Sequence, residues 1–376
     1  MDFSPIASFM EDILIEEKNV PGCDLKIMRH HETLFRHSCG VRNYEATQPI
    51  RRDDLYFLYS CTKPITCAAA MQLVEKGIIG LNDPVKKYLP EFENAFLMVN
   101  GKQVPPKTVM TVRHLFTMSA GFNYDRNTQP IREVLASNPQ AGTLDIINAL
   151  VRSPLQFEPG TKFLYSMCHD VLAAVVEVAS GQKFSKYLQE NIFSPLGMAD
   201  TGFGITAENR PRLVALYDCN KPGQYIPFRD EKDFNLTENY ESGGAGLYST
   251  VQDYSLFADA MANGGIGATG QQILKPETID LMRTDQLGSY VMDTRFGCAA
   301  GPGYGYGLGV RTLIDPSCSR SSLGEFGWDG AAGSYVMIDP KYGLSIFFAM
   351  HVRGWPALIG NGHAVIRDLT YEILGL

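Results

Sequence analysis

The order of apolar and polar positions predicts strands near both ends of the chain and helices through its middle. Strand-like apolar runs occupy residues 24–28, 34–39, 308–313, 334–338 and 344–349. Amphipathic helices are expected from Phe3 to Lys18 and from Ala364 to Ile373. Helical spacing is also found at 112–118, 145–152, 171–178, 184–192 and, behind a Thr250 cap, 251–261. The simplest arrangement is an α/β lobe built from both ends of the chain, with a helical lobe inserted.

Another helix is expected to begin near Ser60, where a short apolar stretch ends. Apolar residues four apart share one face of this helix: Ile65, Ala69 and Leu73. Pro64 falls in the first turn, where a missing N–H costs least. Ser60 is therefore expected at a buried helix start.

Chain length and composition agree with two lobes. The chain has 376 residues, of which 45% are hydrophobic, enough to bury a sizeable core and too many for a disordered chain. We expect residues 1–80 and 206–376 to form a discontinuous α/β lobe, and residues 81–205 to form the helical lobe.

The charge balance and the cysteines exclude several classes of function. Lys and Arg number 33 and Asp and Glu 41, a net charge of −8, so we expect no nucleic-acid partner. No apolar run is long enough to span a membrane, and the N-terminal residues lack the pattern of a signal peptide, so we expect a cytoplasmic protein. Eight cysteines without metal-ligand spacing predict reduced thiols, no metal and no cofactor.

The first candidate for chemistry is Ser60-Cys61-Thr62-Lys63. Residues three apart on a helix share a face, so Lys63 can hold its amine against the Ser60 hydroxyl. A lysine acts as a base only when neutral, which requires burial to lower its pKa well below the usual value. A serine and a lysine at this spacing also occur by chance in many proteins. The predicted buried start of the helix makes a catalytic role for Ser60 and Lys63 more credible than the spacing alone does.

Two later segments are further candidates. Tyr165 follows the Pro159-Gly160 turn and, with cations close by, can serve as a phenolate base; an ordinary core tyrosine is the alternative. The segment from Gly327 to Tyr335 is rich in small residues that let a ligand approach the backbone. The N–H of Ala331 can join that of Ser60 as an oxyanion hole, and a glycine-rich bulge at a sheet edge is the alternative.

These three segments, in this order, resemble the motifs of the serine β-lactamase and penicillin-binding-protein superfamily. The resemblance is strongest to the class C β-lactamase branch, with its family VIII carboxylesterases and D,D-carboxypeptidases. It extends from about residue 10 to the C-terminus and includes the segments 81–85, 88–90, 115–121, 195–198, 246–250 and 304–309. It implies a β-lactamase/transpeptidase-like fold, with an antiparallel sheet flanked by helices, an inserted helical lobe and an active site in the cleft between the lobes.

The resemblance also implies roles for individual residues. Ser60 resembles the acylated nucleophile, and Lys63 resembles the lysine that shares its proton. Tyr165 resembles the tyrosine that is a base in acylation and an acid toward the leaving group. The N–H groups of Ser60 and Ala331 resemble the oxyanion hole. The expected substrate-binding residues are Met167, Trp328, Asp329 and Gly330.

Two departures from the class C pattern bear on the substrate. Met167 stands where those enzymes have asparagine, and Trp328-Asp329-Gly330 stands in place of Lys-Thr-Gly. The missing lysine removes a cation for a substrate carboxylate, which argues against β-lactams and anionic peptide ends. The aromatic residue resembles the esterase branch, where Trp328 would pack on an acyl or alcohol group. Asp329 can alternatively bind a cationic amine, as in an aminopeptidase-like relative.

The sequence therefore predicts a serine hydrolase that acts through a covalent acyl-enzyme on a small ester, amide or lactam. The favoured interpretation is a β-lactamase-family esterase with weak or no β-lactamase activity. The alternatives are a D,D-carboxypeptidase or D-aminopeptidase-like peptidase, a true β-lactamase, and a non-catalytic relative that binds a ligand. A fourth alternative makes Cys61 the nucleophile, although its side chain points about 100° away from that of Ser60. The sequence does not indicate an oligomeric state.

Overall fold

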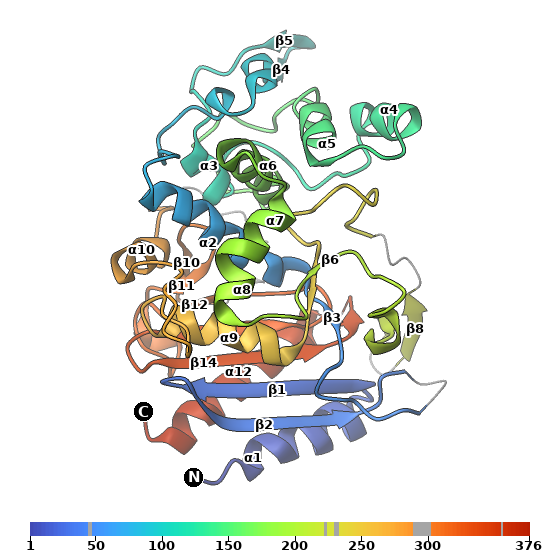
Figure 1. Cartoon of the computed structure of the whole chain (residues 1–376), viewed down its shortest axis with the longest axis vertical. Coiled ribbons are helices and arrows are strands. Elements are labelled where there is room, and N and C mark those ends of the chain that lie inside the picture. Colours follow the sequence, from blue (N-terminus) through green and yellow to red (C-terminus); the bar gives the residue numbers. More distant parts are fainter. Residues whose placement is uncertain (44–46, 222–223, 229–232, 289–301, 355) are drawn as a thin grey trace.

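The computed structural model has a seven-stranded antiparallel sheet at one end and a group of helices at the other (Figure 1). It describes residues 1–43, 47–221, 224–228, 233–288, 302–354 and 356–376. The strand order is β10-β11-β12-β13-β14-β1-β2. These strands are β1 (Gly22–Arg29), β2 (Glu32–Gly40), β10 (Tyr304–Tyr306), β11 (Arg311–Leu313), β12 (Phe326–Asp329), β13 (Tyr335–Asp339) and β14 (Leu344–Met350). Because β1 pairs with β14, the two ends of the chain share one sheet.

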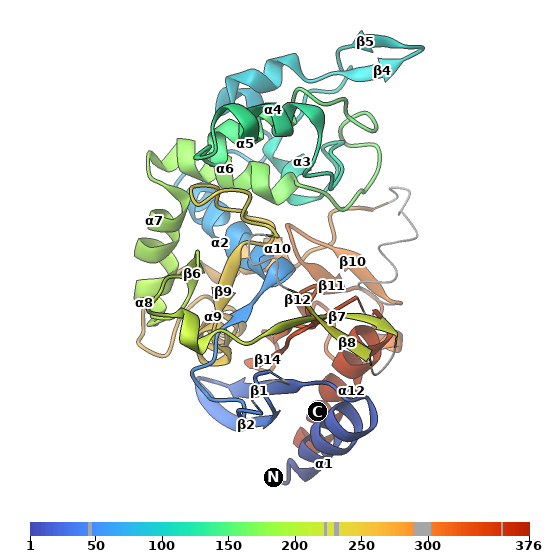
Figure 2. The same ribbon diagram turned by 90° about the vertical axis from the view of Figure 1, so that its right-hand side faces the viewer.

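Helices cover both faces of this sheet (Figure 2). Successive side chains of a strand point to opposite faces, so the apolar run of β14 serves two cores. Ile346 and Phe348 pack in a cluster with residues of α1 (Ser4–Ser8) and α12 (Pro356–Leu374). Phe347 packs in the cluster that includes α9 (Val251–Ala262), and its ring stacks on that of Tyr254 at 4.1 Å between centroids.

Helix α2 (Thr62–Glu75) runs between the sheet and the other helices (Figure 1). It is buried from Thr62 to Leu73 and packs against α6 (Cys168–Ser180). The small residues at 68–70 let neighbouring elements approach it from all sides. The other α-helices in the described residues are α3 (Val112–Phe116), α4 (Gln129–Ser137), α5 (Thr143–Leu150), α7 (Phe184–Leu188), α8 (Ser194–Leu196) and α10 (Pro276–Met282).

Short strands connect these parts. One three-stranded sheet holds β3 (Tyr56–Phe57), β9 (Leu247–Ser249) and β6 (Gly202–Phe203). A second holds β15 (Val352–Arg353), β7 (Leu216–Lys221) and β8 (Gln224–Phe228). A hairpin of β4 (Leu97–Val99) and β5 (Lys102–Val104) lies at the far end of the helical group (Figure 2).

Most of the predicted elements are present. The helix expected from Phe3 is α1 followed by a π-helical stretch, Phe9–Glu17. Thr250 caps α9 by accepting a hydrogen bond from the Asp253 N–H at 3.0 Å, as expected. The strand expected at 308–313 is wrong in its first half, because Gly309 takes a positive φ of 87° in the turn between β10 and β11.

The division into two lobes at residues 80 and 205 stays a prediction. The β4–β5 hairpin was not expected, and it lies within the region predicted to be helical. No helix in the described part of the chain combines the length and the apolarity needed to cross a membrane.

Candidate active site

Ser60 lies in a 3-10 turn, Tyr59–Cys61, that leads directly into α2. Strand β3 comes just before this turn and is held by β9. Tyr59 has a φ of 46°, a left-handed conformation that is costly for a bulky residue. The chain therefore bends sharply before the serine, and Lys63 follows one helical turn later.

The structure brings Ser60, Lys63 and Tyr165 together. The Lys63 Nζ lies 3.2 Å from the Ser60 Oγ, and the Tyr165 hydroxyl donates to the same Oγ at 2.7 Å. The Lys63 Nζ also lies 4.5 Å from the centre of the Tyr165 ring. Tyr165 comes from the segment just before α6, which packs on α2, so the two helices fix this geometry.

Lys63 is fully buried, and burial lowers its pKa from 10.5 to about 7. The nearby Asp170 carboxylate opposes this shift but does not overcome it. Among the described residues, no carboxylate forms an ion pair with the Lys63 amine. Its other two neighbours are the Gly244 carbonyl at 2.7 Å and the Tyr124 hydroxyl at 3.1 Å.

Tyr165 keeps its proton. Burial raises the pKa of its hydroxyl well above 10, and its hydrogen bonds with Ser60 and Trp328 offset only part of this effect. The Trp328 indole N–H donates to the Tyr165 oxygen at 3.1 Å, and the two rings stack with centroids 5.6 Å apart. The cation-stabilised phenolate base expected from the sequence is not favoured by these surroundings.

The glycine-rich segment after β12 lies against the turn that carries Ser60. The Cys61 Sγ is 3.6 Å from the Trp328 carbonyl oxygen. A Cβ added to Gly330 would lie 2.3 Å from the Leu58 carbonyl oxygen, so only glycine allows this approach. This contact holds Gly330, the residue before Ala331, against the turn that carries Ser60. A role for the Ala331 N–H in an oxyanion hole stays a prediction.

The surroundings of Asp329 and Met167 do not fit the substrate-binding roles that were expected for these two residues. The Asp329 Oδ1 accepts a hydrogen bond from the buried Arg311 at 2.8 Å. Its charge is therefore balanced by a fixed cation, which leaves little for a substrate amine. Met167 is 1% exposed and forms the N-cap of α6. A substrate-binding role for these two residues stays a prediction, and the geometry does not support it.

Three features of the site were missed by sequence reasoning: Tyr124, the Gly244 carbonyl and the role of Asp170. Asp170 is buried and accepts hydrogen bonds from Tyr240 at 2.8 Å and Ser242 at 2.5 Å. It thereby holds the loop that presents the Gly244 carbonyl to Lys63. The glycine-rich turn at 243–246 was the available signal, because such turns let a backbone carbonyl approach a site closely.

The thiols and the other titratable groups offer no competing centre. Burial raises the pKa of the Cys61 thiol to about 12, so it stays protonated and is a poor nucleophile. Seven cysteines of the described part are free thiols, and Cys298 lies outside the described residues. Within the described ranges, no three His, Cys, Asp or Glu residues are grouped to hold a metal ion.

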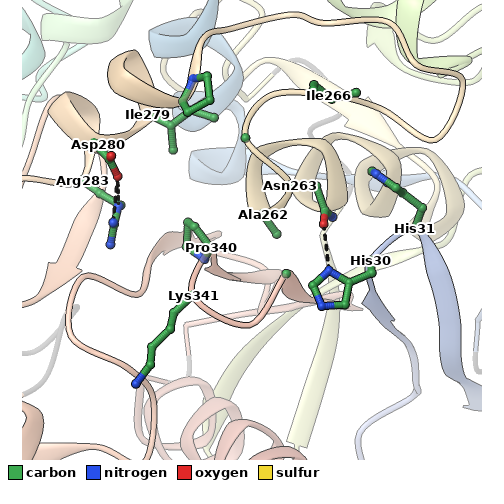
Figure 3. A pocket seen from close by; sticks show the side chains of 13 residues that line it. His30, His31, Ala262, Asn263, Ile266, Ile279, Asp280, Arg283, Pro340 and Lys341 are labelled. Atoms are coloured by element: carbon green, nitrogen blue, oxygen red, sulfur yellow. Dashed lines mark hydrogen bonds and ion pairs between the residues drawn. The ribbon is translucent and has the colours of Figure 1, made fainter.

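A hollow of about 590 Å³ opens at the edge of the sheet, between α10 and the β1–β2 and β13–β14 turns (Figure 3). His30, Asn263, Asp280, Arg283 and Lys341 are among the residues that line it, and none of the predicted site residues is. Figure 3 shows two hydrogen-bonded pairs in the lining of this hollow, His30 with Asn263 and Arg283 with Asp280. The catalytic candidates therefore gather elsewhere, at the start of α2.

A serine in contact with a neutral amine and a phenol is an arrangement for acyl transfer, and the enzyme is a serine hydrolase. Comparison with known proteins identifies its family: a family model described as Beta-lactamase matches residues 6–368, and the chain belongs to this family. Esterase EstB of Burkholderia gladioli is 30% identical over 388 residues, which cover 96% of this chain and 93% of EstB.

Solved structures confirm the β-lactamase/transpeptidase-like fold. The structure described as "EstCE1, a hydrolase with promiscuous acyltransferase activity" is 26% identical, with a TM-score of 0.80 over 98% of both chains. The octameric penicillin-binding protein homologue from Pyrococcus abyssi is 24% identical, with a TM-score of 0.73 over 100% of this chain and 78% of that chain. The latter likeness concerns the fold alone.

Proposed function

We propose that the enzyme is an esterase that hydrolyses small uncharged esters through an acyl-enzyme at Ser60. The observation that carries this proposal is the set of three partners around Lys63. A neutral amine has two N–H groups and one lone pair. The Gly244 carbonyl only accepts a hydrogen bond and the Tyr124 hydroxyl can accept a second, so the lone pair is left for the Ser60 hydroxyl.

In acylation, Lys63 is then the base. The Ser60 proton moves to the Lys63 Nζ while the Ser60 Oγ forms a bond to the ester carbonyl carbon. The N–H groups of Ser60 and Ala331 would stabilise the negative charge on the carbonyl oxygen. A pKa of about 7 for Lys63 makes the neutral amine available at physiological pH.

Tyr165 is then the acid. Its hydroxyl, already donating to the Ser60 Oγ at 2.7 Å, passes its proton to the departing alcohol oxygen as the ester C–O bond breaks. The Trp328 N–H at 3.1 Å stabilises the charge left on the Tyr165 oxygen. In deacylation, a water molecule gives one proton to the Tyr165 oxygen while its own oxygen bonds to the acyl carbon. The protonated Lys63 returns its proton to the Ser60 Oγ as the bond between this oxygen and the acyl carbon breaks, and the carboxylic acid departs.

Uncharged esters are favoured because the groups around Ser60 are aromatic. The rings of Tyr124, Tyr165 and Trp328 form a stacked row, with neighbouring centroids 5.4 and 5.6 Å apart. The name of EstB, the esterase that matches nearly the whole chain, supports the same reaction. A relative from Escherichia coli that is named a putative D-alanyl-D-alanine carboxypeptidase, 27% identical over 87% of this chain, fits the peptidase alternative. The aromatic row around Ser60 is the observation that favours an uncharged ester over a peptide. The cytoplasmic location expected from the N-terminal residues stays a prediction.

The test is intact-mass detection of the acyl-enzyme together with turnover of short-chain esters. We expect a Ser60→Ala variant to lose both the adduct and turnover by at least about 10⁴-fold. Cys61→Ala is the matched control, one residue away, and should keep most of its activity. Turnover that survives Ser60→Ala, or an adduct on another residue, would contradict the proposal.

A further inference from the structure

Two guanidinium groups stand beside the catalytic aromatic residues, and one carboxylate holds both. The Asp233 Oδ1 lies 3.0 Å from the Arg126 Nη2, and its Oδ2 lies 2.6 Å from the Arg353 Nη1. Arg126 also donates to the Asp233 backbone carbonyl. These residues come from three distant parts of the chain: the segment before α4, the segment after β8, and β15. We call this arrangement the Asp233 clasp.

Aromatic side chains connect both guanidinium groups of the clasp to the surroundings of Ser60. They are Tyr59 for Arg353, and Phe234 followed by Tyr124 for Arg126. Arg126 lies over the ring of Phe234 at 3.8 Å, and that ring meets the edges of Tyr59 at 5.4 Å and Tyr124 at 6.1 Å. Arg353 donates to the Tyr59 hydroxyl at 3.3 Å. Tyr59 precedes Ser60 in the chain and the Tyr124 hydroxyl lies 3.1 Å from the Lys63 Nζ, so at most two aromatic side chains separate each guanidinium from Ser60 or Lys63.

The charge balance of the clasp is what a neutral substrate requires. Arg126 and Arg353 are 26% and 24% exposed, so each is partly shielded from water. If they were unpaired, two such cations would attract a carboxylate, since arginine is suited to bind one in a bidentate manner. Asp233 uses both of its oxygens on these two cations. Asp218 contacts Arg353 at 3.2 Å, so two carboxylates balance the two guanidinium groups, and Asp233 is the one that pairs with both.

We propose that Asp233 determines the charge selectivity of the esterase by pairing with both Arg126 and Arg353 close to the catalytic residues. This inference rests on the proposed ester hydrolysis and adds a specificity-determining residue to it. With the clasp intact, the site favours esters whose acyl chain ends in an alkyl group. Without the Asp233 carboxylate, the two arginines would accept an acyl chain that ends in a carboxylate.

The test compares two substrates of similar acyl length, p-nitrophenyl hexanoate and p-nitrophenyl hemiadipate, which differ in the charge at the chain end. The measured quantity is the ratio of kcat/KM for the hemiadipate to kcat/KM for the hexanoate. A ratio cancels any change in the geometry of Ser60, which matters because Arg353 and Phe234 also support Tyr59. A purely structural role for the clasp would lower both rates and leave the ratio unchanged.

We expect Asp233→Asn to raise this ratio by at least about five-fold at low salt, chiefly by lowering the KM for the hemiadipate. The increase should be smaller at high salt, because ions screen the charges of the two arginines. Asp218→Asn is the matched control, since it removes a carboxylate from Arg353 only, and should change the ratio less than about two-fold. Arg126→Gln is expected to lower the ratio, and this variant still tests the proposal if Asp233→Asn does not fold.

An unchanged ratio in Asp233→Asn and in Arg126→Gln, with thermal unfolding showing folded proteins, would overturn the proposal. So would an equal gain in Asp218→Asn. In both cases hexanoate hydrolysis that depends on Ser60 would leave the esterase assignment standing. Failure of the wild-type enzyme to hydrolyse either ester would instead refute the proposed function, and the clasp proposal with it.

Discussion

The buried Lys63 amine predicts a specific pH dependence of protein stability. Its pKa is about 7 in the folded protein, against 10.5 in water. At about 1.4 kcal/mol per pKa unit, charging Lys63 in the folded protein costs about 5 kcal/mol more than in the unfolded chain. Above pH 7 the folded state releases this proton while the unfolded chain keeps it. Stability therefore rises with pH from about 7 toward 10.5. The gain is lost progressively as the pH falls from 10.5 to about 7, and below pH 7 Lys63 changes stability no further.

Lys63→Met is the perturbation that isolates this effect. Between about pH 6 and pH 9, Lys63 should add about 2.5 kcal/mol to the free energy of unfolding of the wild type. The methionine variant has no ionisable group at this position and lacks this increment. The assay is urea unfolding of both proteins at both pH values, and the difference between the two changes cancels every other titrating group. The variant should also be the more stable protein at pH 6, because it avoids a buried charge.

The same titration should appear in the kinetics. The kcat/KM for a neutral ester should rise about ten-fold per pH unit below pH 7 and level off above it, since only the neutral amine accepts the serine proton. Parallel stability curves for the wild type and Lys63→Met, together with a kcat/KM that is flat between pH 6 and pH 8, would refute the assignment of Lys63 as a neutral base.

Three further predictions follow from the contacts of the site. Tyr165→Phe should slow the hydrolysis of alkyl esters by at least about 10²-fold. The hydrolysis of p-nitrophenyl esters should slow by less than about 10-fold, because the acidic p-nitrophenol leaves without needing a proton. Equal losses on both esters would show that Tyr165 is not the acid. Trp328→Phe keeps the ring but removes the N–H, so the alkyl-ester rate should fall by about 10-fold, and an unchanged rate would remove the indole N–H from the mechanism. Asp329→Asn should cost about 3 kcal/mol of stability, measured by urea unfolding, because the buried Arg311 loses the nearer of its two carboxylate partners and keeps only Glu325 at 3.8 Å. A large loss of activity in a variant of normal stability would instead support a substrate role for Asp329.

The parts of the site that the sequence predicted are those set by local geometry. Ser60 and Lys63 are three residues apart across the 3-10 turn and the first turn of α2, so their contact follows from local helical geometry. Tyr165 and the segment at Trp328 were predicted by their resemblance to family motifs, since neither is near Ser60 in sequence. The order of helices and strands was likewise predicted from the spacing of apolar residues, a pattern that depends only on residues close together in the sequence.

The parts that were missed depend on long-range packing. Arg311 faces Asp329 because β11 pairs with β12 in a register that places Arg311 opposite Gly327. Nothing in the composition of either strand specifies that register. Strand β12 was not predicted either, because its glycine is unusual in a strand interior. Tyr124 and Gly244 approach Lys63 from loops whose course is decided by the helices they connect.

The surroundings of Lys63 explain how a buried lysine can remain neutral next to a buried carboxylate. Asp170 raises the Lys63 pKa through space, yet its Oδ1 is engaged by Tyr240, Ser242 and the backbone N–H of Gly244, the last at 3.4 Å. The Lys63 amine meets the Gly244 carbonyl instead. A carboxylate in direct contact would favour the ammonium form and remove the base, whereas a carbonyl orients the amine without adding a full negative charge. Asp170 is thus best understood as a positioning residue, which holds the loop that holds the lysine.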